Sequence, residues 1–154
     1  MAYVNYLASV TEVQVASVVA DPSITIDAAM LEYVSHLVAY WVKVQPLGRL
    51  LGEAIDGGTI LSDSLWHPFR SPLYHPPLRV SALNDELSKA WIEILRDHPT
   101  REIDWFRIEI EKVLKLFQHA AERGHCVLSA MESPMDAERA SRVHIPLKID
   151  FDRR

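Results

Sequence analysis

Histidines, serines, carboxylates and one cysteine are the side chains of this sequence that could carry out acid–base, nucleophilic or metal chemistry. His67 and His75 lie eight residues apart, and Asp63 is near them in the sequence, four residues before His67. However, the chain has neither a His-x-x-x-His pair nor a cysteine pair with the spacing of a zinc site. We therefore predict no metal site and no cofactor, and we expect these imidazoles to bond to backbone carbonyls of an irregular segment.

Cys126 is the only thiol, and His125 precedes it directly. Adjacent side chains of a strand point to opposite faces, so His125 is badly placed to activate the thiol. We expect Cys126 to face the core as a structural residue.

The other nucleophile and carboxylate arrangements are equally nonspecific. The serines near His67 lack the G-x-S-x-G turn of a nucleophilic serine; they are Ser62, Ser64 and Ser71. Glu53 and Asp56 share one helix face next to Gly57-Gly58, which is typical of a solvated helix end. The sequence thus indicates no catalytic residues.

Residues 62–77, SDSLWHPFRSPLYHPP, form the segment richest in recognition residues. Its four prolines lower the entropy cost of holding an open shape, and aromatic residues and arginine dominate interface hot spots. The predicted partner-binding residues are Trp66, His67, Phe69, Arg70, Tyr74 and His75. Two alternatives are that the aromatics fold back as a lid on the core, or that the segment roofs a ligand pocket.

Composition and charge restrict the class of protein. The chain has 154 residues, 49% of them hydrophobic and 24% charged, which predicts one globular domain over residues 1–154. The net charge of −5 argues against binding to nucleic acid or to an anionic membrane. Residues 1–60 carry six acidic side chains against two basic ones, which suits a basic protein partner.

A reducing compartment fits the single cysteine, because no internal disulfide can form. The N-terminus, MAYVNYLASV, lacks the basic region and apolar run of a signal peptide. The apolar stretch 28–44 contains charged residues and is short for a membrane span. We therefore expect a cytoplasmic protein.

The elements that position these residues follow from periodicity and capping signals. Residues 4–10 read as a strand, and Thr11 can cap a helix that ends near Ala20. Apolar residues at helical spacing predict a central helix over 28–44, with His36 buried and hydrogen-bonded inside it. A short helix over 47–55 ends at Gly57-Gly58.

The second half of the chain also contains predicted strands and helices. We expect a short strand over 78–80 leading to Ser81 as a helix N-cap, and a long helix over 102–123 closed by Gly124. Residues 126–131 read as a strand, and the polar segment from 132 leads to an edge strand over 144–151. Together these elements predict an α+β fold with a small, mainly antiparallel sheet packed against several helices.

Four stretches resemble one bacterial family. They are MAYVNYLASVTEVQVASVVADP, QPLGRLLGEAIDGGTI, LRVSALNDELSKAW and FRIEIEKVLKLFQHAAERGHCVLSAM. Their order of strand, helix, Gly-Gly turn and closing strand is similar to that of the YfbM-like proteins over residues 1–131. The central segment and the tail after residue 132 depart from the family. The resemblance implies a single α+β domain with no catalytic residues to carry over, and analogy with small bacterial families suggests an immunity protein.

The expected function is therefore a non-enzymatic protein-binding domain, in particular an immunity protein that neutralises a toxin. The alternative is a small enzyme or ligand-binding protein with a pocket under residues 62–77. A homodimer that pairs the strand over 144–151 across two chains is a further alternative.

Overall fold

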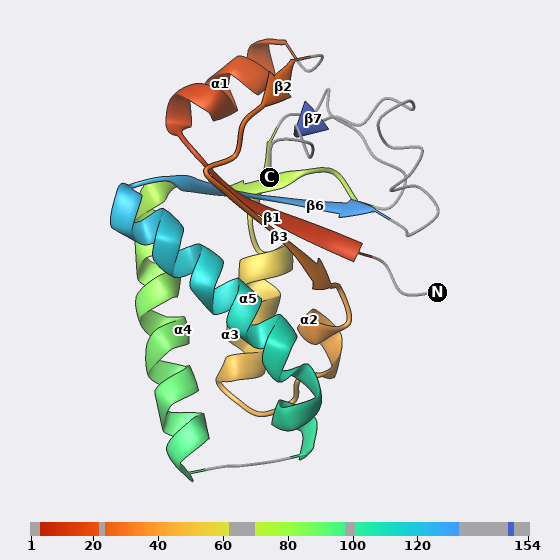
Figure 1. Ribbon diagram of the computed structural model, residues 1–154, viewed down its shortest axis with the longest axis vertical. Coiled ribbons are helices and arrows are strands. Elements are labelled where there is room, and N and C mark those ends of the chain that lie inside the picture. Colours follow the sequence, from red (N-terminus) through yellow and green to blue (C-terminus); the bar gives the residue numbers. More distant parts are fainter. Residues whose placement is uncertain (1–3, 22–23, 62–69, 98–100, 133–147, 150–154) are drawn as a thin grey trace.

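The computed structural model describes residues 4–21, 24–61, 70–97, 101–132 and 148–149. Along the chain the elements are β1 (Val4–Val10), α1 (Glu12–Ala20), β2 (Thr25–Ile26), β3 (Met30–Ser35), α2 (Val38–Trp41), α3 (Leu47–Asp56), β4 (Thr59–Ile60), β5 (Leu73–His75), α4 (Pro77–Asp97), α5 (Arg101–Arg123), β6 (Cys126–Glu132) and β7 (Lys148–Ile149) (Figure 1).

The main sheet has five strands in the order β3-β1-β6-β5-β4, and every neighbouring pair is antiparallel. Its centre is the pairing of β1 with β6, in which Tyr6 lies opposite Ala130. A second, two-stranded sheet pairs β2 with β7 in parallel. The predicted α+β class with a small antiparallel sheet is confirmed.

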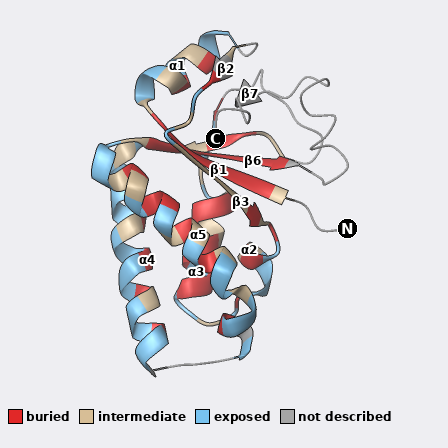
Figure 2. Cartoon of the chain, in the orientation of Figure 1, coloured by how far each residue is buried: buried red, intermediate tan, exposed pale blue. Residues whose placement is uncertain are grey.

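Both faces of the sheet are covered. Figure 1 shows α1 on one side and α3, α4 and α5 on the other. Tyr6, Ala8 and Val10 of β1 belong to the apolar cluster on the α1 side, whereas Leu7 packs with the three long helices. Strand β1 is consequently buried along nearly its whole length, as the red ribbon of Figure 2 shows.

Two predicted helix boundaries are formed by the capping residues expected from the sequence. The Thr11 side chain accepts from the amide of Gln14, whose own side chain accepts from the amide of Thr11, so both members of a capping box are present. At the other end of the fold, Gly124 has a φ of 64° and closes α5 in the left-handed conformation that favours glycine.

The predicted helix over 28–44 is wrong. Met30–Ser35 forms the edge strand β3, and only Val38–Trp41 is helical. In β3, Leu31 and Tyr33 pack on the α1 side while Met30 and Val34 pack on the helix side. Because both faces of this strand meet apolar neighbours, its sequence lacks the alternation that identifies a strand, and the run looked helical.

The predicted strand over 78–80 is also wrong. Helix α4 begins at Pro77, a residue whose fixed φ suits a first helical turn, and Ser81 lies inside the helix. The strand before it is β5, Leu73–His75, near the C-terminal end of the segment over 62–77 that is predicted to be irregular.

Of the predicted edge strand over 144–151, the structure describes only Lys148–Ile149, which pairs with β2. The rest of that stretch and residues 133–143 lie outside the described residues. Among the helices that the structure describes, none combines the length and apolar character needed to cross a membrane.

Candidate functional site

Three of the six predicted partner-binding residues lie within the described part of the chain. Trp66, His67 and Phe69 lie outside it. Arg70 and His75 turn inward, and Tyr74 is half-buried against the apolar cluster on the α1 side. The partner-binding role of the whole set stays a prediction.

His75 is bonded to the end of α3. Its imidazole is buried, and its Nε2 donates to the carbonyl oxygen of Ala54 at 3.1 Å. Burial is the main reason why the pKa of His75 lies below its usual value, because it penalises the charged imidazolium. The histidine therefore acts as a neutral hydrogen-bond donor; the predicted bond to a backbone carbonyl is present, but His75 makes it from strand β5 and not from an irregular segment.

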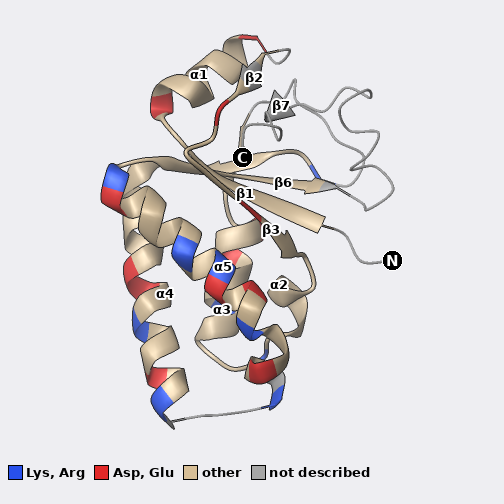
Figure 3. Ribbon diagram, viewed as in Figure 1, with Lys and Arg blue, Asp and Glu red and all other residues tan. Residues whose placement is uncertain are grey.

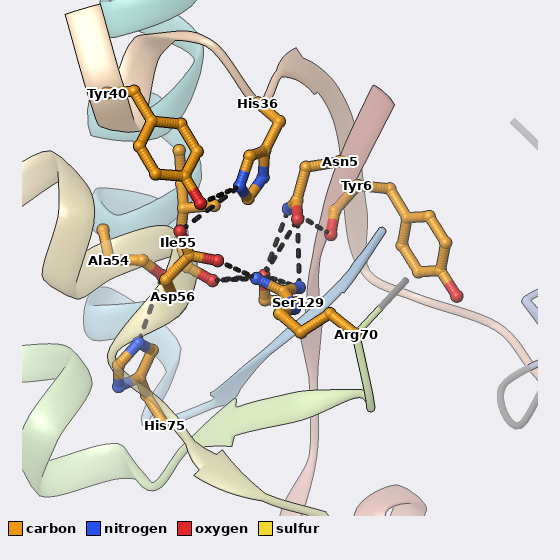
Figure 4. Close-up of polar contacts among 10 residues, drawn as sticks. All are labelled: Asn5, Tyr6, His36, Tyr40, Ala54, Ile55, Asp56, Arg70, His75 and Ser129. Carbon is orange, nitrogen blue, oxygen red and sulfur yellow. Dashed lines mark hydrogen bonds and ion pairs between the residues drawn. The ribbon is translucent and has the colours of Figure 1, made fainter. Parts of the chain in front are cut away.

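Arg70 is the centre of a polar network between α3 and the sheet (Figure 4). Its guanidinium donates to the carbonyl oxygen of Ile55 at 2.8 Å and forms an ion pair with Asp56. It also donates to Oδ1 of Asn5 on β1 at 3.0 Å and to Oγ of Ser129 on β6 at 2.9 Å. One side chain thus ties three elements together.

The position of Arg70 follows from the geometry of helix ends. Ile55 and Asp56 are the last two residues of α3, where backbone carbonyls lack helical partners and the helix dipole is negative. A cation there satisfies a carbonyl and is attracted by the dipole. Because Asn5 and Ser129 point to the same side of the sheet, they complete the set of acceptors.

The network continues from Asp56 to the surface. His36, just after β3, places Nε2 at 3.3 Å from Oδ2 of Asp56 and at 3.2 Å from the hydroxyl of Tyr40 on α2. The predicted burial and hydrogen bonding of His36 are confirmed, although it does not lie in a helix. His36 is buried, and Tyr40 at the end of this path is exposed.

The charges of the network stabilise one another. Burial raises the pKa of Asp56, but the hydrogen bond from His36 and the charges of His36 and Arg70 outweigh it, so the pKa lies below its usual 3.8. For Arg70, burial lowers the pKa and the neighbouring Asp56 opposes that effect. Asp56 and Arg70 therefore form a charged pair at neutral pH.

We call the network of Asn5, His36, Tyr40, Asp56, Arg70 and Ser129 the clamp, because it ties elements of the fold together. His36 uses a single nitrogen for both Asp56 and Tyr40, and its buried Nδ1 has no hydrogen-bond partner. A catalytic relay would need the carboxylate on one nitrogen and the nucleophile on the other. The Ser129 hydroxyl is buried, donates to the carbonyl of Ile55 at 2.7 Å and accepts from Arg70 and Asn5, so its donor and acceptor positions are used within the network.

Cys126 also lies where the sequence predicted. Its side chain is buried on the α1 side of the sheet, and burial raises the pKa of the thiol to about 11. His125 bonds instead to Ser9, with 2.9 Å between Nδ1 and Oγ. Within the described residues, no group of three or more histidine, cysteine or acidic side chains is placed to hold a metal ion.

An exposed group of aromatic residues lies beyond Tyr40. Trp41 of α2 and Trp105 of α5 are 59% and 70% exposed. They line a surface hollow of about 350 Å³ together with Phe106 and Arg101, and we call these four residues the aromatic hollow. The Arg101 guanidinium carbon lies 5.4 Å from the centroid of the Trp105 ring.

Sequence reasoning missed the aromatic hollow. One signal was available, because Trp105 lies outside the stripe of Phe106, Ile110 and Val113 that predicts the buried face of α5. A tryptophan on the outer face of an amphipathic helix is unusual. Its proximity to Trp41 depends on how α2 packs against α5, which periodicity does not reveal.

The fold and the site together define an α+β domain with a rigid internal clamp and an exposed aromatic hollow. A comparison with known protein families, with curated proteins and with solved structures found no match. The YfbM-like resemblance therefore stays a hypothesis based on sequence pattern.

Proposed function

We propose that this protein is a non-enzymatic protein-binding domain whose contact surface includes the aromatic hollow. The observation that carries the proposal is the exposure of Trp41 and Trp105 around one hollow on two different helices. Tryptophan, tyrosine and arginine dominate interface hot spots, and the hollow combines two tryptophans with Arg101. Burying these rings in a partner would remove a large apolar area from water.

The support beneath the hollow favours binding without rearrangement. Ile103 and Ile110 fix the start of α5 in the core, and the clamp holds Tyr40, which precedes Trp41 on α2. A surface that is ordered before binding loses less entropy when a partner arrives. The same clamp anchors Arg70, and with it the described end of the predicted contact segment 62–77.

The partner that suits this chain best is a basic protein, and within the YfbM-like hypothesis it is a toxin that the chain neutralises. The net charge of −5, concentrated in residues 1–60, would speed the approach of a basic partner. An immunity protein needs to hold its toxin and needs no catalytic group of its own, which agrees with the clamp geometry.

The test is affinity capture from cells of the organism that carries the gene, with three purified baits. These are the wild type, a Trp41→Ala/Trp105→Ala variant, and a Val13→Ala/Leu78→Ala variant that removes two exposed apolar side chains elsewhere. We expect one partner to bind the wild type and the control equally. Two hot-spot tryptophans should account for a loss of at least about 2 kcal/mol, or about 30-fold in Kd, in the tryptophan variant.

Retention of the partner by the tryptophan variant, measured with purified components by calorimetry, would contradict the proposed surface. For the toxin hypothesis, the partner should arrest growth when expressed alone, and the wild-type chain should restore growth. A partner that does not affect growth would remove that part of the proposal and leave the binding function.

A further inference from the structure

Two arginine–tryptophan pairs involve arginines of α5, and the two arginines differ in their carboxylate partners. Arg101 lies 5.4 Å from the ring centroid of Trp105, and Arg107 lies 5.8 Å from that of Trp91 on α4. Each pair adjoins a surface hollow of similar size, about 350 Å³ next to Trp105 and about 370 Å³ next to Trp91. The second pair is therefore an internal control for the first.

The guanidinium of Arg107 already has a carboxylate partner. Its Nε lies 3.2 Å from Oε1 of Glu111, one helical turn further along α5. In contrast, Arg101 has no carboxylate partner among the described residues, and exposed Asp104 makes no ion pair with it. Figure 3 shows acidic and basic residues mixed along α4 and α5.

The two hollows also differ in the charged residues that line them. The hollow beside Trp91 includes both Glu111 and Lys115, whereas Arg101 is the one charged residue among the described residues that line the aromatic hollow. Arg101 is also the first residue of α5, so the positive end of the helix dipole adds to its charge. The aromatic hollow is thus an apolar cavity with a positive rim.

We infer that the aromatic hollow binds a partner segment in which a large apolar side chain is followed by a carboxylate, an inference that rests on the proposed protein-binding function. The apolar side chain packs between Trp41 and Trp105. Two N–H groups of Arg101 donate to the carboxylate, a geometry that arginine presents without rearrangement. The hollow lies near the lower limit of ligand pockets, which span about 300–1,000 Å³, so it fits one side chain and its neighbour.

A basic partner can still carry such a segment. Net charge acts over distances up to the Debye length and controls how fast two proteins approach each other. The contact at Arg101 is local and selects one residue of the partner. A lysine at that position of the partner would face the guanidinium and be disfavoured.

The test uses three matched peptides as probes: acetyl-Gly-Phe-Glu-Gly-amide and its counterparts with Gln or Lys in place of Glu. Binding is followed in ¹H–¹⁵N spectra through the indole N–H signals, assigned with single Trp→Phe variants. We expect the Glu peptide to shift the signals of Trp41 and Trp105 and to bind about two- to five-fold more tightly than the Gln peptide, as an exposed ion pair allows. The Lys peptide should bind most weakly.

Two variants locate the origin of the preference. Arg101→Gln should abolish the difference in affinity between the Glu and Gln peptides. Arg107→Gln, which removes the arginine next to Trp91, should preserve that difference. Equal binding of the Glu and Gln peptides to the wild type would overturn the inference, and so would a preference that survives Arg101→Gln. Shifts centred on Trp91 would overturn it as well.

The occupant could also be a second copy of the chain, and this outcome is separable. Shifts of the Trp41 and Trp105 signals with protein concentration, in the absence of peptide, would assign the hollow to self-association and overturn the inference. None of these results depends on the capture experiment. A hollow without carboxylate preference leaves the protein-binding proposal standing, and failure to capture a partner leaves the peptide preference measurable.

Discussion

Replacing Arg70 with methionine is the sharpest test of the clamp. Arg70→Met keeps most of the aliphatic stem and removes the guanidinium that bonds to α3, β1 and β6. Asp56 and Oδ1 of Asn5 then lose their cationic donor. The carbonyl of Ile55 is less affected, because the hydroxyl of Ser129 still donates to it at 2.7 Å.

The expected loss follows from the burial of the groups left behind. Removing one partner of a fully buried ion pair costs about 3–5 kcal/mol. The Asp56 side chain is 30% exposed, so water can replace part of the lost interaction, and we expect about 2–3 kcal/mol. For a chain of 154 residues this corresponds to a decrease in Tm of roughly 5–10 °C.

The assay is urea and thermal unfolding followed by circular dichroism, with Arg79→Met as the matched control. Arg79 of α4 pairs with Glu53 of α3 at 2.7 Å, but both side chains are exposed, so its loss should be less than about 1 kcal/mol. Adding Asp56→Asn to Arg70→Met should recover part of the stability, because it removes the orphaned charge. If Arg70→Met loses no more than Arg79→Met, the clamp has no special role and the reasoning fails.

Three further predictions concern titratable groups. The folded-state pKa of Asp56 is lowered, so its stabilisation is complete above 3.8 and is lost as the pH falls below that value; the difference in unfolding free energy between wild type and Asp56→Asn should shrink there, and a constant difference would refute it. The lowered pKa of His75 has the corresponding effect for a base: the unfolded chain binds the proton more readily, so stability should fall as the pH drops below 6.5. His75→Gln should remove part of that slope but not all, since the pKa of His119 is lowered too; an unchanged slope in urea titrations would count against it. Cys126, with a pKa of about 11 and a buried thiol, should react with iodoacetamide at pH 8 only in denaturant, and rapid labelling of the native protein by mass spectrometry would show that the thiol is accessible.

Local signals in the sequence were sufficient where one residue or one face decides the structure. Thr11 with Gln14, and Gly124 after α5, carry their own boundary chemistry. The strand over residues 4–10 is predicted by its β-branched and aromatic residues and the long helix by its apolar stripe and Gly124, and the structure confirms both. The buried thiol of Cys126 followed from strand alternation in the same way.

Local signals failed where burial on two sides hides the period. The stretch that includes Met30 and Val34 is apolar because α1 covers one face of β3 and the long helices cover the other. An apolar run of that kind fits a helix as well as a strand. This stretch forms a strand because it pairs with β1, from which α1 and β2 separate it along the chain.

The candidate site was likewise only partly predictable from the sequence. Arginine and histidine in residues 62–77 stood out by type, but the sequence could not say that Arg70 would turn inward to the end of α3. The side chains of the clamp come from β1, α2, α3 and β6 and from the segments after β3 and before β5. Trp41 and Trp105 likewise meet across two helices that are far apart in the chain.

The sequence by itself determined the α+β class, the caps at Thr11 and Gly124 and the burial of Cys126. These depend on neighbouring residues and on the alternation of polar and apolar side chains. Only the tertiary structure decided that Arg70 is part of a clamp and that two tryptophans line one hollow with Arg101. Both depend on contacts between residues distant in sequence, and such contacts form only when the sheet and its helices are packed together.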